Sequence, residues 1–155
     1  MKKQLSYFFA SLLGVGFVKK APGTFGSLAS FALIIPVAYF YKTTGIIVLT
    51  LISFIIGYFT TREVLKYTKH DPGFVVIDEL CGQSITFLFV ANSLNLDSYL
   101  LYILGFILFR LFDITKPLLI GWADKKIENS FGVMLDDFFA GLSASIILWI
   151  IALFI

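Results

Sequence analysis

The sequence has almost no cysteine or histidine and few charged residues. Its single cysteine, Cys81, excludes an intrachain disulfide, and with only one histidine, His70, a zinc site is disfavoured. The formal net charge is only +2 and no basic stripe occurs, so composition gives no support for nucleic-acid binding. A Walker-type glycine-rich lysine motif is also missing, which removes the main sequence argument for nucleotide binding.

What the sequence has instead is apolar surface. Hydrophobic residues make up 59% of the chain and its mean hydropathy is +0.93, whereas soluble domains contain about 45–50% apolar residues. The 18 phenylalanines and 7 tyrosines suit contact with lipid or an aromatic belt at the headgroups. A length of 155 residues favours one domain, so residues 1–155 are predicted to form a single membrane-embedded domain.

Long apolar stretches predict the helices of this domain. Residues 28–41 and 46–61 are separated by only a few residues, which predicts an antiparallel helical hairpin. The expected fold is therefore all-α, a small polytopic membrane bundle of about four to five apolar helices. The other apolar stretches are residues 74–91, 99–112 and 138–155.

The N-terminal stretch, residues 4–18, lies between two lysine pairs. It resembles a signal peptide, but Lys19 and Lys20 stand where such a peptide needs small residues for cleavage. We expect it to be retained as a helix in the membrane interface, or as a shallow hairpin.

The distribution of Lys and Arg predicts the orientation of the bundle. Most of them fall in three connections, which alternate threading of the helices places on one side, predicted to be cytoplasmic. The other two connections carry only Lys42 and Asp97 as charged residues. The acidic stretches around Asp78 and Asp136 border the basic side. The basic residues are Lys19, Lys20, Arg62, Lys66, Lys69, Lys116, Lys125 and Lys126.

Two polar segments could bind a phosphate group. After Lys20, a Pro-Gly turn leads to Thr24 and Ser27, whose hydroxyls and backbone N–H groups suit an anion; taken alone, the segment is better explained by an ordinary helix cap and a basic interfacial anchor. Further on, Arg110 and Lys116 could grip phosphate oxygens; the alternative is a structural ion pair of Arg110 with Asp113, three residues away, and a snorkelling lysine.

Two acidic pairs could bind a metal ion. Asp78 and Glu79 begin one apolar stretch, and Asp136 and Asp137 immediately precede another, with Gly141 permitting close approach of a neighbouring helix. Buried carboxylates need compensation, and oxygen ligands favour Mg²⁺ or Mn²⁺. Acids that balance helix dipoles are the alternative, but one acid would suffice for that at each helix.

These segments together resemble the phosphatidylglycerophosphatase A family, and their order and spread cover nearly the whole chain. The resemblance implies an all-α fold and Mg²⁺-dependent removal of the terminal phosphate from the membrane lipid phosphatidylglycerol phosphate, in a bacterial cytoplasmic membrane with the active site facing the cytoplasm. The matching stretches are residues 21–27 (APGTFGS), 77–82 (IDELCG), 109–117 (FRLFDITKP) and 132–141 (GVMLDDFFAG).

We therefore predict a lipid phosphatase and assign a role to each candidate residue. The first alternative is a small ion or proton carrier, since transport paths also use intramembrane acids, and the second is a structural subunit without chemistry. Which carboxylate acts as base or nucleophile, Glu79 or Asp137, stays open. The predicted metal ligands are Asp78, Glu79, Asp136 and Asp137; Asp113 joins them as a catalytic residue; the predicted substrate-binding residues are Lys20, Thr24, Ser27, Arg110 and Lys116.

Overall fold

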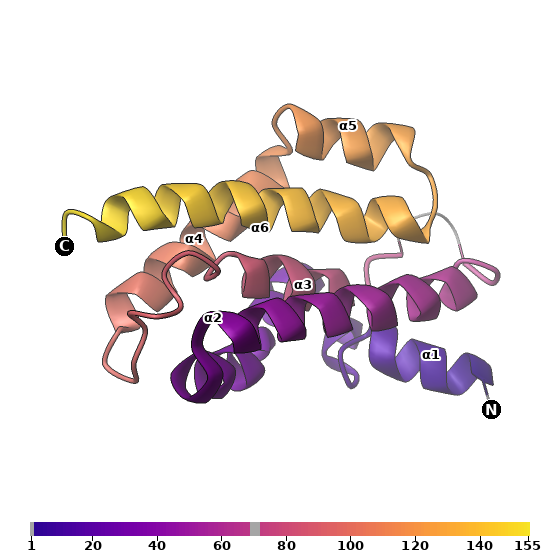
Figure 1. Ribbon diagram of the computed structural model, residues 1–155. Coiled ribbons are helices and arrows are strands. Elements are labelled where there is room, and N and C mark those ends of the chain that lie inside the picture. Colours follow the sequence, from indigo (N-terminus) through magenta and orange to yellow (C-terminus); the bar gives the residue numbers. More distant parts are fainter. Residues whose placement is uncertain (1, 69–71) are drawn as a thin grey trace.

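The protein is a bundle of helices in which two long helices enclose a short one. A computed structural model describes residues 2–68 and 72–155, and within these ranges it contains no strand, which confirms the all-α prediction. Lys69 and His70, which the sequence arguments used, lie outside the described residues. The elements are α1 (Lys2–Ala10), a 3₁₀ turn η1 (Val15–Phe17), α2 (Pro22–Val64), α3 (Ile77–Ile85), α4 (Tyr99–Thr115), α5 (Leu119–Lys126) and α6 (Ser130–Ala152) (Figure 1).

The predicted hairpin is present within α2, which is broken at Lys42. There the backbone takes φ 54° and ψ −143°, outside the helical region. Gly26 in the first half and Gly57 in the second both approach the start of α3, whereas Lys42 Nζ donates a hydrogen bond to the Leu94 carbonyl, 2.7 Å away, beyond the other end of α3. The two halves therefore run in opposite directions along α3.

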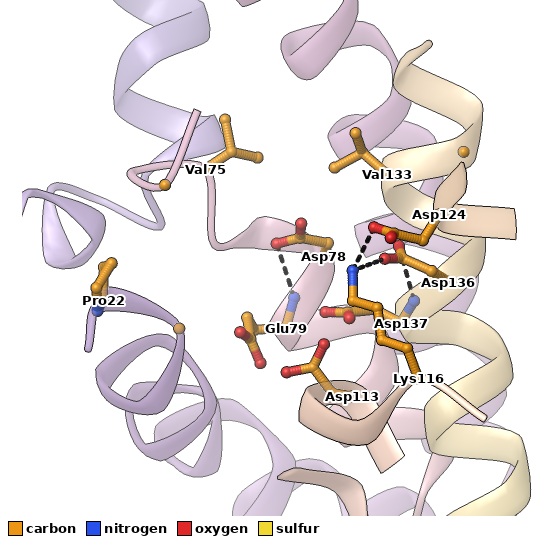
Figure 2. Close-up of a pocket in the computed structure, with 13 residues that line it drawn as sticks. Pro22, Val75, Asp78, Glu79, Asp113, Lys116, Asp124, Val133, Asp136 and Asp137 are labelled. Atoms are coloured by element: carbon orange, nitrogen blue, oxygen red, sulfur yellow. Dashed lines mark hydrogen bonds and ion pairs between the residues drawn. The ribbon is translucent and has the colours of Figure 1, made fainter. Parts of the chain in front are cut away.

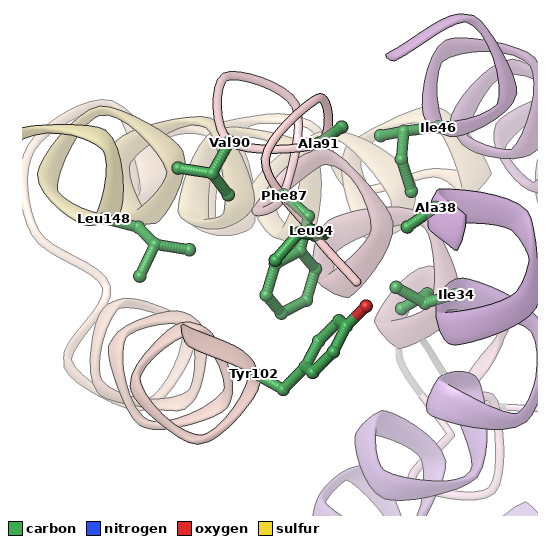
Figure 3. Close-up of a cluster of buried hydrophobic side chains, with 9 residues drawn as sticks. All are labelled: Ile34, Ala38, Ile46, Phe87, Val90, Ala91, Leu94, Tyr102 and Leu148. Carbon is green, nitrogen blue, oxygen red and sulfur yellow. The ribbon is translucent and has the colours of Figure 1, made fainter. Parts of the chain in front are cut away.

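The third predicted apolar helix, residues 74–91, does not form as a continuous span. α3 has only nine residues, all buried, and turns follow it as far as residue 97. A crossing helix needs about 20 residues, so α3 is a core helix. The turns after it carry Phe87, Ala91 and Leu94 into a buried apolar cluster between α2, α4 and α6 (Figure 3).

Glycines set the distance between α3 and its neighbours. A Cβ atom on Gly141 of α6 would lie 2.1 Å from the Gly82 carbonyl oxygen of α3, so the two helix backbones touch there. This confirms the close approach predicted at Gly141, and the contact holds the start of α3 beside the first half of α6.

Two helices in the described residues are long and apolar enough to cross a membrane, α2 and α6. The larger number of crossing helices expected from the sequence is not confirmed, because α3 is short and α4 has 17 residues. At the N-terminus, α1 has nine residues, too few to cross, and Ala10 accepts a 2.8 Å hydrogen bond from the Val76 amide. An interfacial position for this segment stays a prediction.

Candidate active site

A cavity of about 210 Å³ lies where the start of α2, the start of α3, the end of α4, α5 and the first half of α6 meet (Figure 2). Its wall holds most of the acidic side chains of the chain, which come from α3, α4, α5 and α6. The lining residues are Pro22, Gly23, Gly73, Val75, Asp78, Glu79, Asp113, Lys116, Asp124, Gly132, Val133, Asp136 and Asp137.

The first acidic pair occupies the first turn of α3, as predicted. Asp78 and Glu79 are each only 7% exposed. The Asp78 carboxylate accepts a 3.0 Å hydrogen bond from the Glu79 amide, one of the unpaired N–H groups at the helix start. The positive end of the helix dipole lowers the cost of placing both acids here, although it does not neutralise them.

Glu79 is held by α2 and α4 together. Arg110 Nη1 lies 2.5 Å from its Oε1 atom, and the Ser27 hydroxyl donates a 2.6 Å hydrogen bond to Oε2. Burial and the nearby Asp113 carboxylate raise the pKa of Glu79 to about 7, while Arg110 and Ser27 oppose that rise. Ser27, predicted to bind substrate, is therefore engaged with Glu79.

Arg110 forms ion pairs with two carboxylates, and one of its N–H donors has no hydrogen-bond partner in the described residues. Its Nη1 atom also lies 2.7 Å from Asp113, which confirms the ion pair predicted from their spacing. Its Nε atom is buried and has no hydrogen-bond partner within the described residues. A buried guanidinium N–H without a partner carries a desolvation penalty.

Lys116 extends from the residue that ends α4. Its backbone is left-handed, with φ 44°, and Pro117 then prevents the helix from continuing. The ammonium group binds Asp136 at 2.8 Å and also pairs with Asp124 of α5. Although burial opposes its charge, the hydrogen bonds that the ammonium group donates to these two carboxylates raise the pKa of Lys116. Sequence reasoning missed Asp124, whose signal was its place in the polar block that contains Lys116 and Asp136.

The second acidic pair lies inside α6, not ahead of it as predicted. The helix begins at Ser130 because the Asn129 side chain caps it, accepting a hydrogen bond from the Phe131 amide at 2.8 Å. Asp136 and Asp137 therefore sit beyond the first turn, 7% and 4% exposed, and the dipole explanation applies to them less well than to the first pair. Lys116 pairs with Asp136, but no ion pair or hydrogen bond to the Asp137 carboxylate occurs in the described chain.

The Pro-Gly turn contributes differently from the expectation. Pro22 and Gly23 line the cavity, whereas neither Lys20, which is exposed, nor Thr24 belongs to its lining. A Cβ atom on Gly23 would lie 2.2 Å from Glu79 Oε1 and 3.2 Å from Arg110 Nη1. Glycine at this position therefore leaves room for the Glu79–Arg110 pair, a role that sequence reasoning did not assign.

Carboxylates dominate the polar lining of the cavity. Six of them line it; Arg110 pairs with Glu79 and Asp113, and Lys116 pairs with Asp124 and Asp136. No group of three or more His, Cys, Asp or Glu residues in the described part is already arranged as a metal site. All the acidic donors are oxygen atoms and Cys81 is buried in the core, so the set suits a hard cation such as Mg²⁺ better than zinc.

Comparisons with known proteins agree on one family. The family model described as Phosphatidylglycerophosphatase A matches residues 8–152. A protein of that name from Haemophilus influenzae is 35% identical over 89% of this chain and 83% of its own length, and one from Escherichia coli is 31% identical over 90% and 81%. A Bacteroides thetaiotaomicron protein named "Putative phosphatidylinositol-3-phosphatase" is 33% identical over 89% and 90%. No solved structure matches the chain.

Proposed function

Because the chain belongs to the phosphatidylglycerophosphatase A family, we propose that it hydrolyses phosphatidylglycerol phosphate to phosphatidylglycerol and inorganic phosphate in phospholipid biosynthesis. The observation that carries the proposal is the cavity lined by six carboxylates and Lys116 (Figure 2), two of whose carboxylates pair with Arg110. The alternative of a small ion or proton carrier is not supported, since the matching relatives of the family are named as phosphatases.

Mg²⁺ is the cation that fits the donor set. Asp78, Glu79, Asp136 and Asp137 come from α3 and α6, which the Gly82–Gly141 contact holds together. Bound among these acids, Mg²⁺ would supply positive charge to the phosphate oxygens and acidity to a water molecule. The gathering of six carboxylates in one cavity supports this proposal.

Arg110 and Lys116 would hold the phosphate. Arg110 has a buried Nε donor without a partner in the described chain, and Lys116 lines the cavity directly. Both side chains already lie within ion-pair distance of the carboxylates, so phosphate oxygens entering the cavity meet oriented donors. Donors fixed in this way stabilise the charge that develops on the phosphoryl oxygens.

Asp137 is the best candidate for the general base. Glu79 is engaged by Arg110 and Ser27, whereas the Asp137 carboxylate makes no such contact with the described residues. In this scheme Asp137 accepts a proton from the attacking water, whose oxygen bonds to phosphorus. The bond from phosphorus to the glycerol oxygen breaks, that oxygen takes a proton from solvent water, and Asp137 releases its proton to solvent.

The catalytic proposal is tested with purified protein in detergent micelles. We expect phosphate release from phosphatidylglycerol phosphate with Mg²⁺ and none with excess EDTA. Phosphatidylinositol 3-phosphate serves as the comparison substrate, because one relative is named "Putative phosphatidylinositol-3-phosphatase". Release that persists in EDTA would contradict the metal proposal, and faster release from the inositol lipid would contradict the proposed substrate.

A further inference from the structure

A second, apolar groove of about 330 Å³ lies between the first half of α2 and α4. Leu28, Phe31 and Ile35 line it from α2, and Tyr99, Ile103 and Phe106 line it from α4. None of these six side chains carries a charge, in contrast to the acidic cavity. We call this feature the α2–α4 groove.

The α2–α4 groove and the active-site cavity share the same face of α4. Tyr99, Ile103 and Phe106 line the groove and Arg110 and Asp113 belong to the site, at successive spacings of four, three, four and three residues. This spacing keeps side chains on one face of a helix. One face of α4 therefore lines the apolar groove in its first part and carries the charged residues of the site in its last part.

α2 shows the same continuity. Ser27, which binds Glu79, is followed by Phe31 and Ile35 at intervals of four residues, and Leu28 is its direct neighbour. The groove thus begins within one helical turn of the site on both of its walls.

Aromatic packing stiffens the groove. The Phe31 ring makes edge contacts with Tyr102, at 6.0 Å between centroids, and a tilted contact with Phe106 at 6.3 Å. Tyr102 in turn packs on the buried Phe87, which anchors it to the core (Figure 3). A groove with such a floor is preformed, so an occupant would not have to order it.

We propose that the α2–α4 groove binds an acyl chain of the lipid whose phosphate occupies the active-site cavity. A charged cavity that opens into an uncharged groove matches the head and tail of a phospholipid. The groove positions the lipid while the cavity carries out the chemistry. The inference rests on the proposed phosphatase function and adds a binding site for the tail.

The test compares two isoleucines of α4 that are equally exposed, at 53% each: Ile103, which lines the groove, and Ile107, which does not. We expect Ile103→Trp to fill the groove and lower kcat/KM for dioleoyl phosphatidylglycerol phosphate about tenfold, equivalent to about 1.4 kcal/mol. The same variant should hydrolyse the water-soluble deacylated headgroup at the wild-type rate, and Ile107→Trp should leave both rates unchanged.

Two results would contradict binding of the acyl chain in the groove, and a third would contradict the proposed function. If Ile103→Trp slows both substrates alike, or if the two tryptophan variants behave identically, the groove does not bind the chain. If the wild-type protein hydrolyses neither substrate, the proposed function fails, and the groove is then judged by binding alone.

Photo-crosslinking supplies that binding readout without any mutation. A phosphatidylglycerol phosphate analogue with a diazirine in its acyl chain should label the groove residues of the wild-type protein. Unlabelled phosphatidylglycerol phosphate should compete with this labelling, whereas phosphatidylcholine should not. Labelling spread evenly over the exposed apolar surface, or insensitive to the competitor, would overturn the proposal.

Discussion

At the scale of single residues, the acids of the site differ in which cationic side chain balances the negative charge of each carboxylate. Glu79 and Asp113 share Arg110, and Asp136 shares Lys116 with Asp124. Removal of one partner from a buried ion pair typically destabilises a protein by about 3–5 kcal/mol, because the other charge stays buried. These four acids are therefore tied to the fold as well as to any chemistry.

Asp137 differs, and its replacement separates stability from activity. We expect Asp137→Asn to reduce phosphate release by at least about 10²-fold, because the variant loses the proposed base. Its melting temperature in EDTA should stay the same or rise, since burying an uncompensated carboxylate is unfavourable. Parallel activity and thermal-unfolding measurements check both effects.

Asp136→Asn is the matched comparison, because it removes a carboxylate that Lys116 binds. Its melting temperature in EDTA should fall. If Asp137→Asn keeps full activity, or unfolds at a lower temperature than Asp136→Asn, the assignment of Asp137 is wrong.

Much of the site could be foreseen from residue types and their order. The pair Arg110–Asp113 follows from helical spacing, and the acids at the start of α3 follow from the switch to apolar sequence. Asp124 and Gly23 were not foreseen, although Asp124 lies in the polar block that contains Lys116 and Asp136. Asp124 pairs with Lys116 across the turn between α4 and α5. Gly23 has no side chain, which leaves room for the Glu79–Arg110 pair. Neither property leaves a periodic signal in the sequence.

At the scale of helices, the contact between α3 and α6 positions both acidic pairs. A Cβ atom on Gly141 would meet the Gly82 carbonyl oxygen at 2.1 Å, so α6 would have to move away from α3. We expect Gly141→Ala to destabilise the protein by about 1–3 kcal/mol and to lower kcat, because Asp137 lies one turn before Gly141 and would move with the helix.

Gly73→Ala is the control for stability, since a Cβ atom there has no neighbour within 4 Å. Thermal unfolding of both variants checks the expectation. If Gly141→Ala is as stable as Gly73→Ala, the two helices are not in contact at this point.

The helices themselves were predicted unequally well. The hairpin at Lys42 was expected from two apolar stretches with a short connection, and α4 begins at Tyr99 as predicted. The stretch after Phe74 was misjudged because hydrophobicity alone does not distinguish a membrane-crossing helix from a short buried helix followed by buried turns. The start of α6 was misjudged because its cap, Asn129, precedes the apolar run by two turns.

At the scale of the whole molecule, the site lies at one end of α4 and the α2–α4 groove extends from it towards the other. The 17 residues of α4 span about 26 Å, close to the roughly 30 Å hydrocarbon thickness of a bilayer. The basic residues Lys125 and Lys126 follow at the site end, whereas Asp97 precedes α4 at the far end. The positive-inside rule therefore predicts that the site end of α4 faces the cytoplasm.

Two cysteine reporters test that orientation, because Cys81, the native cysteine, is fully buried. Lys126 and Asp97 are both exposed, at opposite ends of α4. In intact bacterial spheroplasts, a membrane-impermeant maleimide should label Asp97→Cys but not Lys126→Cys, which should react only after permeabilisation. The reverse pattern would place the active site outside. If neither reporter reacts before permeabilisation, α4 does not cross the bilayer. The lipid would then enter the groove from the cytoplasmic leaflet alone.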